Sequence, residues 1–352
     1  MRRLAVMFAL MVAPAAAQTP PAAESAPAAE PSALDTLRAG AEAARPLVSS
    51  DLARAFLTAT LALPEVQPRT VFRTADRSRC YTPAQAAALT ADERAALTER
   101  TLDASFYWNT GYGSPVAYAR TLDLAAQRGE GLLGAAVVDF GAGGLGAPRL
   151  LATTGCTVVA VDVDPLLPAF YSEPGDTGRM PQMPDHDVGT LTLVTGHWPG
   201  DPAAADAVRA ALPQGVDLFL SKNTLKRGYL HPAEEVDPRR LVHLGVSDEE
   251  FVAAVFAALR PGGLFMIYNL CPAPAAAGQP YIPWADGHCP FPREMLEAAG
   301  LQVLDFDVVD DEAARAMGHA LGWDQGESPM NLKDDLFAWF TVARRPAAGD
   351  PK

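Results

Sequence analysis

The chain has 352 residues, 49% of them apolar, and carries 42 acidic against 28 basic side chains. This composition excludes a wholly disordered protein, because the apolar residues suffice for a buried core. The net charge of −14 argues against a nucleic-acid-binding protein, since such proteins normally present a basic surface to the phosphate backbone.

The first residues have the layout of a secretory signal peptide, which we place at residues 1–17. Two arginines follow Met1, residues 4–12 form an apolar run, and residues 15–17 offer an A-x-A cleavage site. The apolar run falls short of the roughly 20 residues that span a bilayer. We therefore expect a periplasmic or secreted protein with no stable membrane span after cleavage.

A linker and a helical region are predicted next. Residues 18–33 are rich in alanine and proline and have too little bulky apolar surface to order, so we interpret them as a disordered tether. Ser50 precedes apolar residues at helical spacing, and residues 90–93 have the pattern of a capping box. Pro115 fits the first turn of a further helix. We expect a helical cap over residues 34–131, without strands.

An aromatic, glycine-containing stretch at residues 106–115 interrupts this helical region. Two interpretations remain open. The stretch is either a loop whose aromatic rings cover the core, or a lid over a ligand site that follows it in the sequence.

From Ala135 onward, short apolar strands alternate with helices, which favours a parallel sheet with helices on both faces. Two further strand-like runs near the C-terminus fit an antiparallel pair. The predicted strands are residues 135–140, 157–161, 191–195, 216–220, 264–268, 301–309 and 336–343. The predicted fold class is α/β, a Rossmann-like three-layer sandwich over residues 132–345. Its mostly parallel sheet has seven strands, and a polar tail follows at 346–352.

The most informative segment is the glycine-rich turn after the first of these strands. Gly141, Gly143 and Gly146 form the pattern G-x-G-x-x-G, in which glycines allow a tight turn and let a ligand approach the backbone. Asp162 ends the next strand, where a carboxylate can accept hydrogen bonds from a ribose diol. Asp139 precedes the turn; its charge opposes a pyrophosphate and suits a ligand with an ammonium group. An adenosine-containing ligand is predicted.

These features resemble the class I S-adenosylmethionine-dependent methyltransferases. Residues 139–143 are similar to the first motif of that family, residues 159–164 to its second-strand motif, residues 217–223 to its fourth-strand motif, and residues 259–264 to its turn into the fifth strand. The resemblance implies S-adenosyl-L-methionine as the cofactor. It also implies that Gly141 and Gly143 line the methionine end, with Asp139 nearby, and that Asp162 holds the ribose.

The sequence departs from the family pattern in two places. The third glycine falls one position late, at Gly146, so we expect a wider turn. After the third strand, Gly196, His197 and Trp198 stand where an acidic residue often meets the adenine amine. Stacking on Trp198 or contacts with the backbone would then recognise the adenine.

Candidate catalytic groups follow the fourth strand, because ligands bind at the carboxyl ends of parallel strands. Asn223 would contact the methionine end or the acceptor, His231 would act as a base, and Lys226 with Arg227 would hold an acidic acceptor. The alternative is a solvated basic loop. The acceptor itself, a small molecule or an envelope component, is not identified by the sequence.

Four cysteines and several histidines complete the candidates. We expect a disulfide between Cys271 and Cys289, which would stabilise the fold by about 3 kcal/mol. Cys80 would be free or paired with Cys156. No histidine has metal-ligand spacing on a defined element, including His186 and His288, and no metal site is predicted.

Three functions are compatible with these observations. The first is a methyltransferase, and the second is a binding or scaffold protein that keeps the fold without turnover. The third is an NAD-dependent oxidoreductase, which Asp139 and the terminal strand pair disfavour.

Overall fold

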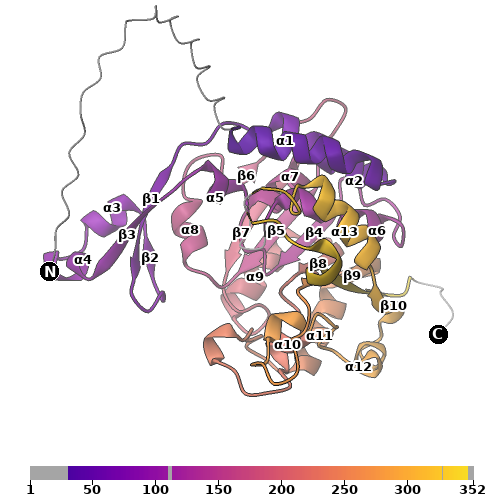
Figure 1. Ribbon diagram of the computed structural model, residues 1–352. Coiled ribbons are helices and arrows are strands. Elements are labelled where there is room, and N and C mark those ends of the chain that lie inside the picture. Colours follow the sequence, from indigo (N-terminus) through magenta and orange to yellow (C-terminus); the bar gives the residue numbers. More distant parts are fainter. Residues whose placement is uncertain (1–30, 110–112, 327, 348–352) are drawn as a thin grey trace, which may run out of the picture. The chain divides into compact units, whose positions relative to one another are not determined.

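The computed structural model describes residues 31–109, 113–326 and 328–347 (Figure 1). The predicted signal peptide and nearly all of the predicted tether lie outside these residues. The described residues from Ser32 onward form one compact unit. Within the described residues, no helix is long and apolar enough to cross a membrane.

An eight-stranded mixed sheet forms the centre of this unit. Its strands are β4 (Ala136–Phe140), β5 (Thr157–Asp162), β6 (Gly178–Arg179), β7 (Thr190–Thr195), β8 (Val216–Lys222), β9 (Leu259–Cys271), β10 (Gln302–Val309) and β11 (Phe337–Arg344). The order across the sheet is β10-β11-β9-β8-β4-β5-β7-β6. Strands β7, β5, β4, β8 and β9 run parallel, whereas β11 is antiparallel to both β9 and β10. All seven predicted strands are present, and β6 adds a short antiparallel edge.

Alternation along the strands separates two apolar cores. Val137 of β4 and Leu218 of β8 face one core, whereas their neighbours Val138 and Phe219 face the other. This period of two is what a sheet covered on both faces requires. The fold is therefore the predicted α/β Rossmann-like sandwich, with an antiparallel C-terminal strand pair and helices at the N-terminus.

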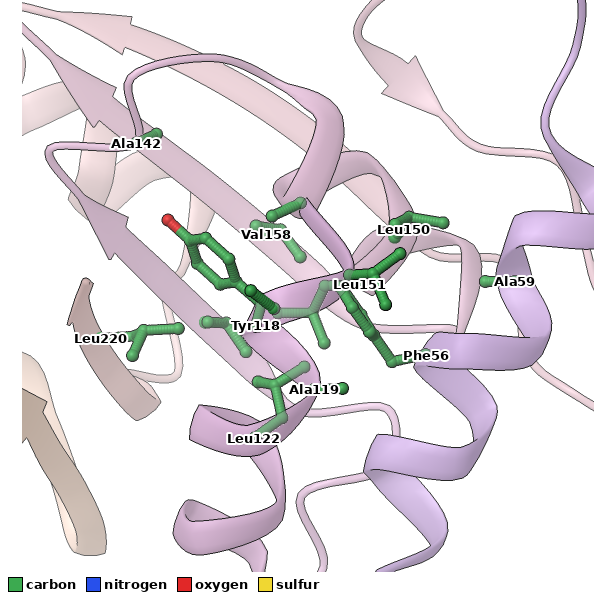
Figure 2. Packing of buried hydrophobic residues seen from close by; sticks show 14 of the residues in the cluster. Phe56, Ala59, Tyr118, Ala119, Leu122, Ala142, Leu150, Leu151, Val158 and Leu220 are labelled. Carbon is green, nitrogen blue, oxygen red and sulfur yellow. The ribbon is translucent and has the colours of Figure 1, made fainter. Parts of the chain in front are cut away.

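Helices cover both faces of the sheet. The first face carries α1 (Ala33–Ala44), α2 (Asp51–Thr58), α6 (Tyr118–Ala126), α7 (Gly146–Thr153) and α13 (Asp311–Ala320), and the second carries α9 (Pro202–Ala211), α11 (Asp248–Ala258) and α12 (Arg293–Ala298). Figure 2 shows the first core, in which Phe56 of α2 and Leu122 of α6 pack beside Leu151 of α7. Shorter helical segments include α8 (Leu166–Phe170), α10 (Arg227–Leu230) and α14 (Leu332–Asp335). There are also 3-10 turns at Arg45–Leu47, Ala59–Ala62, Pro115–Ala117, Pro238–Arg240 and Pro283–Ala285.

The helix starts predicted in the N-terminal region are confirmed. The Ser50 side chain caps α2 by accepting from the amide of Ala53. Thr90 and Glu93 form the capping box of α4 (Ala91–Ala95), which ends after five residues. The segment after Pro115 begins as a 3-10 turn and continues as α6.

The expectation of an N-terminal region without strands is wrong. A three-stranded antiparallel sheet is formed by β1 (Arg69–Thr74), β2 (Cys80–Tyr81) and β3 (Leu97–Leu102), with the helix α3 (Pro83–Ala87) beside it. Four consecutive residues of β3, 98–101, are exposed. Because the strands are polar and mostly uncovered, the sequence lacks the apolar alternation by which a strand is recognised.

The predicted Cys271–Cys289 disulfide is also wrong, because all four cysteines have free thiols. Cys271 ends β9, where its sulfur packs against Gly287 and the Lys226 ammonium. Cys289 belongs to the second apolar core together with Phe291. The short sequence separation favoured a bridge, but each thiol is buried in surroundings of its own.

Candidate functional site

The glycine-rich turn joins β4 to α7 at the carboxyl edge of the parallel strands. Gly141 and Gly143 have φ angles of 71° and 63°, in the left-handed region that favours glycine. The Gly141 amide donates to the carbonyl of Val161 on β5 at 2.8 Å. Its carbonyl accepts from the Thr224 hydroxyl at 3.0 Å. The turn is thus held between the ends of β5 and β8.

Gly143 and Gly146 differ in what surrounds them. A Cβ atom added to Gly143 would meet no atom within 4 Å, so its backbone faces open space. A Cβ atom on Gly146 would collide with the Trp108 carbonyl at the end of α5 (Ala104–Trp108). Gly146, at the first turn of α7, therefore allows close packing against α5 and lies away from the open space beside Gly143.

Asp162 lies opposite the turn at the end of β5. Its Oδ2 accepts from the Gly143 amide at 2.8 Å, and its Oδ1 accepts from the Asp164 amide at 2.9 Å. Burial raises the pKa of this carboxyl, while the two amides favour its charged form. Each carboxylate oxygen can accept a second hydrogen bond, so Asp162 can still bind a ligand hydroxyl.

A first cavity of about 280 Å³ lies above this turn. It brings together Gly141, Gly143, Asp162 and Trp198, four of the residues that the sequence predicted for cofactor binding. The other lining residues are Phe140, Val161, Val163, Gly196, His197, Thr224, Leu241, Val242 and His243. We name it the nucleoside cavity, because its turn, its carboxylate and its apolar wall match the chemistry of a nucleoside.

Trp198 contributes a wall of this cavity from within the second core. Its ring centroid lies 5.0 Å from that of Phe219 and 5.7 Å from that of Phe251. The side chain is only 4% exposed, so its position is fixed by packing. His197 beside it is exposed and contacts the carbonyl of His243 at 2.9 Å through Nδ1.

Asp139 lies beneath the turn, in a buried cluster with Tyr118 and Lys222. The Tyr118 hydroxyl hydrogen bonds to the carboxyl group and points toward Ala142 of the turn (Figure 2). The Lys222 ammonium lies 5.1 Å from the centre of the Tyr118 ring. Burial raises the pKa of Asp139, whereas Lys222 lowers it. The Oδ1 atom of Asp139 is buried without a hydrogen-bond partner among the described residues.

Asn223 occupies the turn that follows β8, with a φ angle of 65°. Its amide donates to the Tyr268 carbonyl at 3.0 Å, and its Oδ1 accepts from the Leu270 amide at 2.7 Å. These bonds hold the end of β8 against β9. Asparagine tolerates this left-handed conformation better than most residues.

A second cavity, of about 450 Å³, begins at Asn223. Thr224, the next residue, lines the nucleoside cavity, so the turn after β8 contributes to both spaces. The second cavity is lined by Gly113, Asn223, Leu270, Cys271, Pro272, Trp284, Trp323, Ser328, Met330, Asp335 and Leu336. We name it the tryptophan cavity after Trp284 and Trp323.

The other two predicted catalytic residues, Lys226 and His231, are not among the described residues that line either cavity. The Lys226 ammonium donates to the carbonyls of Leu270 at 2.6 Å and Trp284 at 3.3 Å. Burial lowers its pKa. His231 is half-exposed and pairs with Asp248 at 2.6 Å. The predicted partner of Lys226, Arg227, pairs with Asp286 at 2.7 Å.

Sequence reasoning missed three residues of the site: Tyr118, Lys222 and Thr224. Tyr118 comes from the N-terminal helices and has no motif of its own. Lys222 was a visible signal, because it ends an apolar strand where a charge would be buried, but it was grouped with a basic loop. No cluster of metal-ligating side chains occurs among the described residues.

No protein-family model matches the sequence, and no curated protein matches it. Among solved structures, the chain is similar to the [4+2]-cyclase SpnF, with 18% identity over 69% of this chain and 86% of that chain, at a TM-score of 0.37. It is similar to Haemonchus contortus phosphoethanolamine N-methyltransferase 2 in complex with S-adenosyl-L-methionine, with 13% identity over 83% of this chain and 74% of that chain, at a TM-score of 0.36. A TehB-like SAM-dependent methyltransferase from Corynebacterium glutamicum has 18% identity over 64% of this chain and 86% of that chain, at a TM-score of 0.31.

Likenesses this weak carry no argument about function. In the central sheet, the last strand, β11, is inserted antiparallel between β9 and β10. The chain has a Rossmann-like α/β fold with an antiparallel C-terminal strand pair and added N-terminal helices.

Proposed function

We propose that the protein is an S-adenosylmethionine-dependent methyltransferase. The observation that carries the proposal is the unpartnered Oδ1 atom of Asp139, buried beneath the glycine turn. A buried acceptor without a donor is costly, and an ammonium group would satisfy it. A pyrophosphate would instead be repelled, which disfavours the alternative of an NAD-dependent oxidoreductase.

The residues around the nucleoside cavity fit the rest of this cofactor. Asp162 would accept from the ribose hydroxyls, and Gly143 would let the ligand approach the backbone. The apolar wall at Trp198 would cover the adenine. Bound there, S-adenosyl-L-methionine would supply a methyl group activated on its sulfonium.

The tryptophan cavity would hold the acceptor. Asn223 lies where this cavity begins, and its Nδ2 atom donates no hydrogen bond to any other described residue. We propose Asn223 as a positioning group for the acceptor, because Lys226 and His231 are not among the described residues that line either cavity. Catalysis would consist mainly of holding the donor and the acceptor in line.

Calorimetry with S-adenosyl-L-methionine, S-adenosylhomocysteine and NAD tests the proposal. We expect both sulfur ligands to bind and Asp162→Asn to weaken them roughly tenfold or more, because hydrogen bonds to a charged group are lost. Asp164→Asn is the matched control, since Asp164 follows on the same loop but lines neither cavity. Binding of NAD alone would overturn the proposal. Absence of binding by every nucleoside would favour a scaffold protein.

A further inference from the structure

The tryptophan cavity has a lining that narrows the class of molecule it accepts. Its described walls come from five places: Gly113, the turn after β8, the end of β9, the loop through Trp284, and the insertion between β10 and β11. The insertion carries Trp323, Met330 and Asp335. Met330 is 37% exposed, an uncovered apolar side chain at the rim of a cavity. Such surface is what an apolar ligand would bury.

Among the described residues that line this cavity, Asp335 is the only charged one. It lies at the end of α14, where its Oδ2 accepts from the Asn331 amide at 3.2 Å and its side chain remains exposed. The described part of the lining contains no lysine, arginine or histidine. An anionic ligand would therefore enter without a counter-charge, whereas a cationic ligand would find a carboxylate.

Two basic side chains contact residues of the cavity wall but are not among its described lining. Lys226 donates to the carbonyls of Leu270 and Trp284 behind the wall. Arg240 lies over the Trp284 ring, 5.1 Å from its centre, without lining the cavity. The contacts of Lys226 disfavour the prediction that basic residues after β8 hold an acidic acceptor.

We infer that the tryptophan cavity binds an apolar or aromatic amine, with its ammonium group directed to Asp335. The two indole rings would hold the apolar part and would also attract the cation through their faces. The net charge of −14 would draw cations to the protein. This inference rests on the proposed function, because it makes the amine the methyl acceptor.

The test compares two probes of nearly equal shape and opposite charge, 4-phenylbutylamine and 4-phenylbutyrate. The protein is first titrated with S-adenosylhomocysteine, which tests the proposed function separately. Each probe is then titrated by calorimetry into the saturated protein. We expect the amine to bind and the acid to bind at least about tenfold more weakly, because only the amine has a counter-charge.

Two adjacent aspartates provide the variants. Asp335→Asn should weaken the amine by about three- to tenfold and leave the acid unchanged. Asp334→Asn is the matched control, since Asp334 is its exposed neighbour but does not line the cavity. Trp323→Leu should weaken both probes.

Equal binding of the two probes, tighter binding of the acid, or equal effects of both aspartate variants would overturn the inference. If S-adenosylhomocysteine binds and neither probe does, the inference fails while the proposed function stands. If the amine binds and S-adenosylhomocysteine does not, the cavity has the inferred preference but the proposed function is wrong.

Discussion

At the scale of single residues, the site depends on a carboxyl group in a place that disfavours its charge. Asp139 is 2% exposed, and the groups facing it are the Tyr118 hydroxyl, the Lys222 ammonium and the more distant carboxylate of Asp162. Burial opposes ionisation, and Lys222 and Tyr118 only partly offset it. A cationic ligand beside Asp139 would therefore stabilise the charged form of this carboxyl group.

This environment predicts a pH-dependent affinity. Burial raises the pKa of Asp139 to about 7, and an ammonium ligand binds the deprotonated form. The affinity for an ammonium ligand is therefore retained above this pKa and lost as the pH falls below it. Between about pH 7.5 and about pH 5.5, we expect S-adenosylhomocysteine to bind roughly twentyfold more weakly, as calorimetry at each pH would measure.

The control for this prediction is Asp139→Asn, which should bind more weakly at neutral pH and respond less to pH. Burial also raises the pKa of Asp162 and lowers that of Lys222 to about 7, so any dependence that survives in the variant would belong to these two residues. If the unaltered protein binds S-adenosylhomocysteine with the same affinity over this pH range, the role given to Asp139 is contradicted.

Part of this site was predictable from the sequence. A glycine turn and an acidic strand end have fixed places in a parallel sheet, so Gly143 and Asp162 could be placed at one cavity. The direction of side chains in an irregular loop has no such rule. Lys226 turns inward to two carbonyls and His231 outward to Asp248, and nothing in their spacing distinguishes them.

At the scale of elements, the unexpected sheet of β1, β2 and β3 is joined to the main fold by a buried ion pair. Arg69 of β1 donates to both oxygens of Asp176, at 2.6 and 3.0 Å. The Tyr107 hydroxyl donates to the same carboxylate at 2.7 Å and accepts from Arg149 of α7 at 2.9 Å. One carboxylate thus connects β1, α5 and α7.

Removing that carboxylate's charge should destabilise the protein strongly. The side chains of Arg69 and Asp176 are only 12% and 3% exposed, so Asp176→Asn leaves the guanidinium with only the exposed carboxylate of Glu173, at 3.1 Å, as its counter-charge. We expect the free energy of unfolding, measured in urea, to fall by about 3 kcal/mol. Asp206→Asn, which removes an exposed pair with Arg209, should cost about 0.5 kcal/mol or less. Equal losses in the two variants would refute the connecting role.

The central strands that were predicted from the sequence are more deeply buried than those that were not. Strands β4, β5 and β8 are covered on both faces, so their continuous apolar runs stand out in the sequence. Strands β1 and β3 carry arginines and threonines, and their pairing depends on long-range contacts such as that of Arg69 with Asp176. A local pattern cannot show such a contact, because the partner lies elsewhere in the chain.

At the scale of the whole molecule, the cysteines bear on the predicted compartment. Export remains a prediction from residues 1–17. An oxidising compartment would favour disulfides. Cys156, Cys271 and Cys289 are nevertheless buried with free thiols, and only Cys80 is half-exposed. Burial raises the pKa of the Cys271 thiol to about 11 and that of Cys289 to about 12. A fold that keeps its thiols protonated and covered resists oxidation without a bridge.

This account predicts the reactivity of the thiols toward Ellman's reagent. In the folded protein, Cys80 should react first and the three buried thiols slowly, because thiolate is scarce and access requires opening of the structure. In denaturant without a reductant, all four thiols should react, since none is bridged. Cys80→Ser should remove the first phase alone. Two reactive thiols in the unfolded protein would reveal a disulfide and restore the bridge that the sequence favoured, whereas four would mean that packing alone holds the loop between Cys271 and Cys289.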